Sequence, residues 1–129
     1  MHFISSEAPL AQRAKKRLAK IYGNVPLDKA EVVIALGGDG LMLQALHESL
    51  KSGLPVYGMN RGSVGFLMNE FNEKALAERL TKAESTLIRP LRMKAISHDG
   101  KSHDHLAFNE VSFLRQRFQA AKLAISIDG

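Results

Sequence analysis

The sequence contains no cysteine, which excludes disulfide bonds and thiolate metal sites. Long apolar runs are also missing, since none approaches the roughly 20 residues that span a bilayer. The start, Met1 to Ile4, has no basic flank followed by a long apolar core. With 45% hydrophobic and 24% charged residues, the composition is that of a globular protein rather than a disordered chain. We therefore expect a soluble, cytoplasmic protein with no membrane partner.

Negative charge is the scarcer sign, with 13 acidic against 18 basic residues and a formal net charge of +5. Such a surplus favours anionic partners without selecting among nucleotides, nucleic acid and lipid head groups. The densest basic cluster, residues 13–20, is typical of the solvated face of a helix. Because no aromatic residues are interleaved with these charges for stacking on bases, we expect no nucleic-acid partner.

Strand and helix patterns alternate in the first part of the chain. Apolar runs predict strands at residues 2–4, 32–36 and 55–59, and apolar residues at helical spacing predict helices at about 7–22, 41–51 and 73–82. Ser5 or Ser6 is expected to cap the first helix, and Asn72 the third. This order predicts an α/β fold with a Rossmann-like parallel sheet and flanking helices, whose ligands gather at the carboxyl ends of strands.

Helical spacing stops at about residue 85. Segments 87–97, 106–114 and 121–127 are expected to be strands, with a turn at 98–101 after the first. The change predicts two domains, 1–87 and 88–129, of which the second is the beginning of an all-β domain. Because the last strand runs into an Asp-Gly hairpin signal and no returning strand follows, we expect this domain to be truncated and the chain to be a fragment.

The turn Gly37-Gly38-Asp39-Gly40 places one acid between a predicted strand and a predicted helix. Glycine permits backbone conformations that a Cβ forbids, and three glycines clear side-chain atoms from around the carboxylate. A helix N-terminus nearby favours a phosphate-bearing ligand. Asp39 is then able to cap the helix, to hold Mg²⁺ bound to phosphates, or to accept a proton from an attacking hydroxyl. The turn is not a P-loop, because no Gly-Lys-Ser/Thr follows it.

A second glycine-punctuated loop, residues 60–66, also follows a predicted strand, so we expect it at the same edge of the sheet. Arg61 in this loop is either a phosphate ligand or an ordinary solvated arginine. Phe66, at its end, is either a ligand contact or an anchor in the core.

Three histidines near the turn at 98–101 invite interpretation as a metal site, but their spacing does not put two on one helical face. We expect them to be exposed residues of a hairpin connection. They are His98, His103 and His105. The pair Asn109-Glu110 has, by itself, the character of an ordinary polar pair in or beside a strand.

These stretches together resemble a known family. Residues 36–40, after an apolar strand, resemble the signature shared by the NAD kinases, the 6-phosphofructokinases and the diacylglycerol and sphingosine kinases. Residues 56–67, 107–111 and 124–129 are similar to the NAD kinase branch specifically. The stretches occur in the family's order and spacing and cover essentially the whole chain.

The resemblance implies a phosphofructokinase-like fold and an enzyme that uses ATP to phosphorylate the adenosine-ribose 2′-hydroxyl of NAD, giving NADP. It also implies Mg²⁺ or another divalent cation with ATP and a homo-oligomer, a dimer or tetramer. Asp39 matches the family's general base, Gly40 lies beside the substrate, Phe66 lines the pocket, and Asn109 and Glu110 match a pair that binds NAD. The expected binding set is completed by Gly37, Gly38 and Arg61.

Two departures from the family matter. Leu41 and Met42 stand where the family often has a small polar residue, so no hydroxyl contact is expected there. The glycine-rich motif that completes the family's NAD pocket lies beyond Gly129, so the 129-residue chain alone is expected to be poorly active. Two alternatives stay open: a lipid or sugar kinase of the same superfamily, and a non-catalytic nucleotide-binding module.

Overall fold

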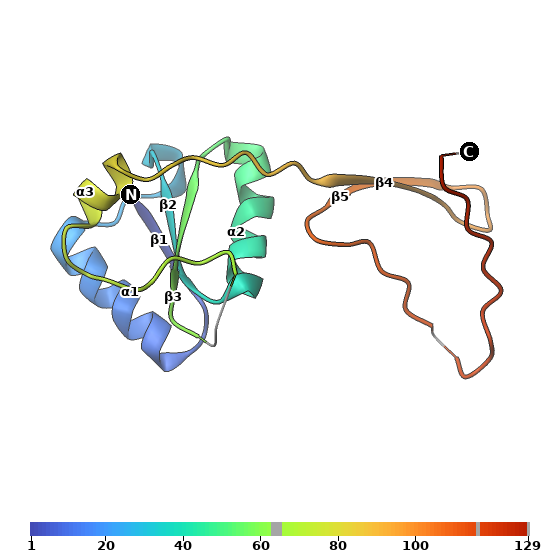
Figure 1. The fold of residues 1–129 in the computed structure, drawn as a ribbon, viewed down its shortest axis with the longest axis horizontal. Helices are drawn as coiled ribbons and strands as arrows, with labels where there is room; N and C mark the ends of the chain where they lie inside the picture. Colours follow the sequence, from blue (N-terminus) through green and yellow to red (C-terminus); the bar gives the residue numbers. More distant parts are fainter. Residues whose placement is uncertain (63–65, 116, 129) are drawn as a thin grey trace. The chain divides into compact units, whose positions relative to one another are not determined.

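The computed structural model describes residues 1–62, 66–115 and 117–128. The chain divides into two compact units, Met1–Arg89 and Pro90–Gly129 (Figure 1). We call them the first and the second unit and describe each by itself. That they correspond to two functional domains stays a prediction.

The first unit is an α/β unit built on a parallel sheet with strand order β1-β2-β3. The predicted fold class is confirmed. Its strands are β1 (His2–Ser5), β2 (Val33–Gly37) and β3 (Val56–Asn60). Its helices are α1 (Pro9–Tyr22), α2 (Asp39–Ser52) and α3 (Leu76–Thr81), with a 3₁₀ turn at Leu27–Lys29.

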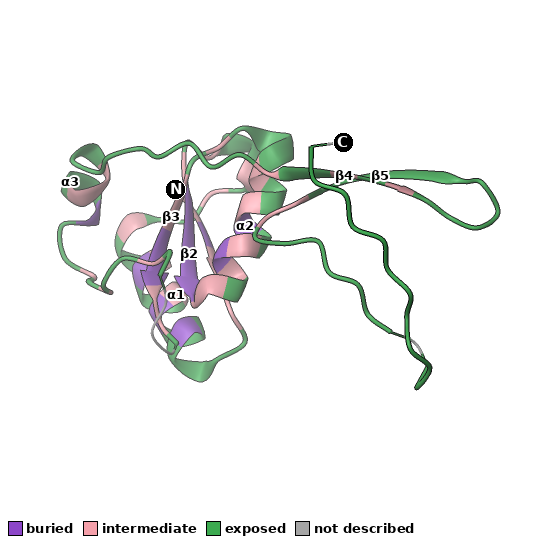
Figure 2. Ribbon diagram, turned by 45° about the vertical axis from the view of Figure 1, so that its right-hand side comes forward, coloured by how far each residue is buried: buried purple, intermediate pink, exposed green. Residues whose placement is uncertain are grey.

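Strand β2 is buried along its whole length, as its unbroken apolar run predicts (Figure 2). On one face, Ile34 and Leu36 pack in a cluster with residues of β1, α1, β3 and α3. The opposite face lies against α2, because a Cβ built on Gly58 would be 3.2 Å from the Met42 sulfur. Helices α1 and α2 therefore cover opposite faces of the sheet and leave the carboxyl ends of the strands uncovered between them.

The predicted helix caps are wrong at two N-termini. Helix α1 begins at Pro9, whose fixed φ suits the first turn, and its N-cap Ala8 makes no side-chain cap bond. Asn72 does not cap α3 either; its Oδ1 accepts the Lys74 N–H at 2.9 Å in a local turn. Asn and Ser side chains satisfy turns as readily as helix ends, so their presence alone does not locate a cap. Helix α1 ends at Tyr22, as predicted, and Gly23 follows it with φ 76°.

The second unit contains one antiparallel hairpin, β4 (Leu91–Ile96) with β5 (Ser102–Ala107). Its turn at 98–101 is confirmed. The strand predicted at 106–114 is wrong, because β5 lies earlier and consists mainly of polar residues. Residues 121–127 form no strand. A strand requires a partner to pair with, which an apolar pattern does not supply.

Burial differs between the units. All buried apolar residues in the described part of the chain belong to the first unit, and no described residue of the second unit is buried. Across the described ranges, no helix combines the length and the apolar character that a membrane crossing requires.

Candidate functional site

The candidate site is built where β2 and β3 end side by side. Gly37 is in register with Asn60, and the Arg61 N–H donates to the Gly37 carbonyl at 2.7 Å. The loop after β3 then runs along the glycine turn, since a Cβ on Gly62 would lie 3.7 Å from the Gly38 nitrogen. The prediction that both loops share one edge of the sheet is confirmed. Residues 63–65 of the predicted loop lie outside the described residues.

The glycines of the turn provide space rather than unusual backbone angles. None of the three has a positive φ, and Gly38 is extended at φ −117° and ψ −172°, so the predicted need for conformational freedom is wrong. A Cβ on Gly38 or Gly40 would meet nothing within 4 Å. A Cβ on Gly37 would lie 2.9 Å from a Leu41 methyl carbon. Gly37 is therefore tightly packed, so that a side chain there would displace Leu41, while Gly38 and Gly40 leave open space beside Asp39.

Asp39 connects the two loops. It is the half-buried first residue of α2, and its Oδ2 accepts the Phe66 N–H at 2.9 Å while its Oδ1 accepts the Leu67 N–H at 3.1 Å. We call these two bonds the Asp39 bridge. The N-cap of α2 is Gly38, which makes no side-chain cap bond. The cap interpretation of Asp39 is therefore wrong, because its carboxylate binds a loop 27 residues further along the chain.

The Asp39 bridge leaves the carboxylate able to accept further hydrogen bonds. An ionised carboxylate offers about four acceptor positions, of which the bridge occupies two. The bridge also fixes the orientation of the side chain, and the first turn of α2 stabilises negative charge there. Asp39 is thus positioned to accept a further hydrogen bond from a hydroxyl placed in the space beside Gly38 and Gly40.

The Phe66 side chain is 96% exposed, so the interpretation as a core anchor is wrong. Its backbone is held by the Asp39 bridge, whereas its ring is available to a ligand. The same residue therefore has a backbone N–H bound to the Asp39 carboxylate and an aromatic side chain that is not covered by other residues.

Arg61 is not a freely solvated arginine. Its guanidinium carbon lies 3.2 Å from the centroid of the Phe71 ring, in a cation–π stack. Burial lowers the pKa of Arg61, and the positive charge of Arg17 lowers it further, while Glu73 acts in the opposite direction. The group nevertheless stays charged at any physiological pH.

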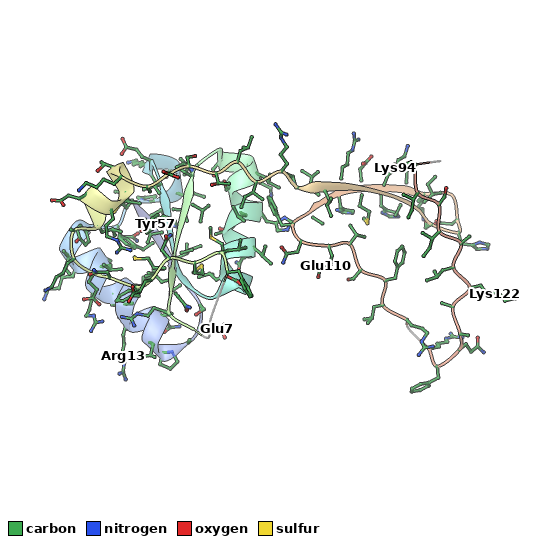
Figure 3. All side chains as sticks on the ribbon, in the orientation of Figure 1. Glu7, Arg13, Tyr57, Lys94, Glu110 and Lys122 are labelled. Atoms are coloured by element: carbon green, nitrogen blue, oxygen red, sulfur yellow. The ribbon has the colours of Figure 1, made fainter. Side chains whose placement is uncertain are left out.

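Asn109 and Glu110 lie in the second unit and are exposed, on the segment that follows β5 (Figure 3). Asn109 has φ 72°, a left-handed conformation that asparagine tolerates better than most residues. The Glu110 N–H donates to the Phe108 carbonyl at 3.2 Å. Because they belong to a different unit from Asp39, their place in the site stays a prediction.

The three histidines are exposed, as predicted, but His103 and His105 lie in β5 and not in the connection. Only His98 belongs to the turn. Among the described residues, no group of three histidine, aspartate or glutamate side chains is arranged to hold a metal ion.

Two features of the site were not anticipated. The donors of the Asp39 bridge are backbone amides, which every residue other than proline possesses, so no side-chain pattern marks them. Phe71 lies ten residues from Arg61 and is distinguished only by the contact that the fold creates.

Residues 5–88 match the family described as the ATP-NAD kinase N-terminal domain. A NAD kinase of Caulobacter vibrioides is 57% identical over 127 residues, which cover 98% of this chain and 49% of that protein. A NAD kinase of Cereibacter sphaeroides is 52% identical (98% and 50% covered), and one of Brucella suis is 50% identical (100% and 50% covered). The chain spans about half the length of the curated relatives it matches.

Proposed function

We propose, because this chain belongs to the ATP-NAD kinase family, that its protein transfers a phosphoryl group from ATP to the adenosine-ribose 2′-hydroxyl of NAD. The similarity to proteins named NAD kinase over 98% or more of the chain is the observation that carries this proposal. The Asp39 bridge supports it physically, because it presents one oriented carboxylate at the open edge of a parallel sheet.

Asp39 is the general base of the proposed reaction. A ribose hydroxyl is a weak nucleophile, so a carboxylate that accepts its proton as the oxygen attacks the γ-phosphorus assists the step, and ADP leaves. Most of the acceleration comes from alignment of the two substrates and from neutralisation of phosphate charge. Both bonds of the Asp39 bridge keep the carboxylate in one orientation, which this alignment requires.

The proposal includes a divalent cation, which would bind together with ATP. The described residues offer a single carboxylate at the turn and no cage of three ligands. This fits Mg²⁺, which proteins typically bind through one or two carboxylates together with substrate phosphates. The ion would be held mainly by the phosphates of ATP, near Asp39, and would neutralise phosphate charge. A homo-oligomer and a cytoplasmic location complete the proposal.

The remaining substrate contacts are assigned by the same reasoning. Gly38 and Gly40 provide the space in which the ribose approaches Asp39, Gly37 keeps the turn close to Leu41, and the exposed Phe66 ring lines the pocket. Asn109 offers a donor and an acceptor and Glu110 an acceptor for NAD.

The substrate is tested with the full-length protein. Purified enzyme is incubated with ATP and, separately, NAD, diacylglycerol or fructose 6-phosphate, and the phosphorylated product is measured. We expect NADP alone. Product from the lipid or the sugar, without NADP, would overturn the assignment in favour of another kinase of the superfamily. Nucleotide binding without any product would favour a non-catalytic module.

The role of Asp39 requires two variants. Asp39→Asn removes the base and also damages the Asp39 bridge, because an amide nitrogen cannot accept an N–H. Leu67→Pro removes one donor of the bridge and keeps the carboxylate. We expect Asp39→Asn to lower kcat by roughly 100-fold or more and Leu67→Pro to lower it less. Equal losses would show that Asp39 acts only by holding the loop.

A further inference from the structure

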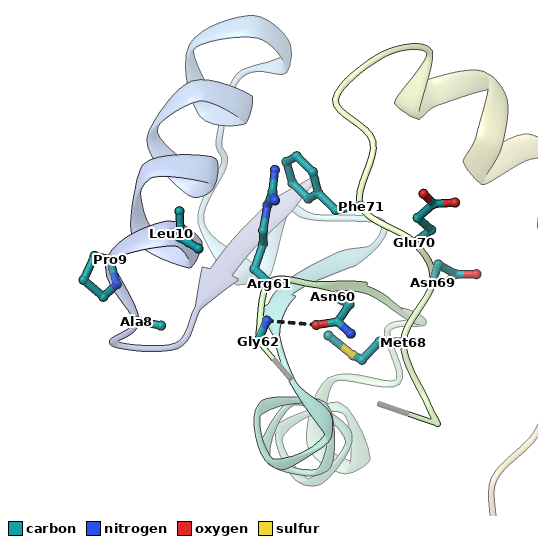
Figure 4. A pocket seen from close by; sticks show the side chains of 10 residues that line it. All are labelled: Ala8, Pro9, Leu10, Asn60, Arg61, Gly62, Met68, Asn69, Glu70 and Phe71. Carbon is teal, nitrogen blue, oxygen red and sulfur yellow. Dashed lines mark hydrogen bonds between the residues drawn. The ribbon is translucent and has the colours of Figure 1, made fainter. Parts of the chain in front are cut away.

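A cavity of about 750 Å³ opens on the α1 side of the glycine turn. It is lined by the start of α1, by residues 60–62 and by residues 68–71 (Figure 4). Gly62 in its wall also lies close to the Gly38 backbone, since a Cβ on Gly62 would be 3.7 Å from the Gly38 nitrogen. The cavity therefore adjoins the space in which Asp39 would act.

Arg61 is the only cation among the lining residues of this cavity. Its guanidinium carbon lies 3.2 Å from the centroid of the Phe71 ring, and this stack restricts the movement of the group. In the described part of the chain its side chain makes no hydrogen bond, and its buried Nε has no partner. A fixed, unpaired fork of donors is suited to a bidentate oxyanion.

The charges around Arg61 leave a positive excess. Glu73 forms an ion pair with Arg17, and both groups act on Arg61. Two guanidinium groups thus share one carboxylate. Glu70, the one acid in the cavity wall, stands apart from Arg61 on the other side of Phe71 in Figure 4. An anion in the cavity would complete the charge balance of this cluster.

A second cavity, of about 480 Å³, adjoins the turn at Gly40 and has the opposite character. Its lining contains Glu7 and Glu48 and no cation. Two carboxylates there disfavour a phosphate chain, whereas Arg61 favours one. The difference in charge favours the Arg61 cavity over the second cavity for phosphate oxygens.

We propose that Arg61, held against Phe71, binds the oxyanions of a phosphate chain in this cavity, next to the glycine turn. The identity of the chain rests on the proposed function, which offers two sources: the triphosphate of ATP and the diphosphate of NAD. Arg61 is then a residue that determines phosphate binding, and Phe71 is a positioning residue that acts through it.

The phosphate-binding role is tested with inorganic tripolyphosphate and the full-length protein. Calorimetric titration compares the wild type with Arg61→Gln, Arg61→Lys and Arg13→Gln. Arg13 is exposed, projects from α1 (Figure 3) and does not line the cavity, so its replacement makes the same charge change outside the cavity wall. We expect Arg61→Gln to weaken binding by roughly 10-fold or more, Arg61→Lys by less, and Arg13→Gln by no more than about 2-fold.

Equal weakening by Arg61→Gln and Arg13→Gln would overturn the proposal, because it would show general charge attraction only. If Arg61→Gln fails to fold, Phe71→Leu supplies the test: it keeps the cation and removes the stack. Binding that is unchanged in Phe71→Leu and Arg61→Lys would also overturn the proposal.

The KM values of Arg61→Lys for ATP and for NAD show which substrate supplies the phosphate chain. A KM that rises for ATP and not for NAD assigns the cavity to the donor, and the reverse assigns it to the diphosphate of NAD. Unchanged values for both would overturn the proposal. A wild type that makes no NADP would contradict the proposed function, while the tripolyphosphate titration would still decide the role of Arg61.

Discussion

The first unit buries Phe3, Ile34 and Leu36 in a core covered by helices, whereas the second unit buries no described residue although it is also rich in apolar side chains. Phe113 and Ile125, for example, are 89% and 84% exposed. A parallel sheet covered on both faces forms a core within 89 residues, while a lone two-stranded hairpin is at best marginally stable. Both units contain stretches that resemble the NAD kinase family, but only the first unit is stabilised by a core of its own.

The largest expected difference between the units is in amide hydrogen exchange. Amides of Ile34 and Leu36 exchange only through extensive unfolding of the first unit, whereas those of Met93 and His105 in the hairpin need only local opening. We expect protection factors in β2 to exceed those in β4 and β5 by roughly 1,000-fold or more. Exchange measured by NMR on the 129-residue chain checks this. Similar protection in both sheets would mean that the second unit has a core of its own.

The same contrast is tested by paired truncations. Leu36→Ala leaves a cavity in the core and is expected to lower the free energy of unfolding by about 2–5 kcal/mol. Ile125→Ala removes an exposed side chain and is expected to change it by less than about 0.5 kcal/mol. Urea unfolding followed by circular dichroism measures both. A large effect of Ile125→Ala would contradict the comparison.

These contrasts explain which features the sequence predicted. The apolar run before Gly37 and the glycine-rich loop after β3 predicted parallel strands with a shared functional edge, because buried strands and turn residues are local signals. The partners of Asp39 and Arg61 could not be predicted in the same way. Phe66 and Leu67 contribute backbone amides, and Phe71 contributes a ring that only the tertiary fold brings to Arg61.

The predictions of strands in the second unit were wrong for a related reason. Ser102 to Asp104 are polar, yet they pair with β4 because the turn at Gly100 brings them opposite it. Residues 121–127 have the apolar pattern of a strand and no partner in the described chain. The period of the apolar residues indicates which face of a strand would be buried. Whether the strand forms depends on a neighbouring strand with which it can pair.

Within the first unit, replacing Gly40 with alanine is expected to change stability and activity in opposite directions. It lies in the first turn of α2 with open space around it, so alanine is expected to raise the free energy of unfolding by up to about 1 kcal/mol. The added Cβ would occupy the space beside Asp39, and phosphorylation of NAD is expected to fall. Urea unfolding and initial rates check the two effects.

Gly38→Ala is the matched control for Gly40→Ala, because Gly38 also faces open space but lies outside the helix. It is expected to lower the rate without the gain in stability. A Gly40→Ala enzyme of full activity would contradict the view that this space receives the ribose.

The smallest expected effect concerns the hairpin turn of the second unit. Hydrogen bonds from the side chains of Lys101 and Ser97 hold the pKa of Asp99 below its ordinary value of 3.8. A carboxyl group with a depressed pKa stabilises the folded form above the unfolded pKa, and this contribution is lost as the pH falls through the folded pKa. NMR titration of the Gly100 amide should therefore show a transition below pH 3.8, absent in Asp99→Asn.

The Ile34 amide serves as the internal control for that titration, since it lies in the core of the first unit, away from the hairpin turn in the sequence. Asp99 is fully exposed, so the transition should weaken with added salt. A Gly100 transition that persists in Asp99→Asn would contradict the prediction, because it would show that a titrating group other than Asp99 causes it. A transition that disappears would mean that side-chain contacts within a few residues stabilise the hairpin, in contrast to the long-range packing around β2.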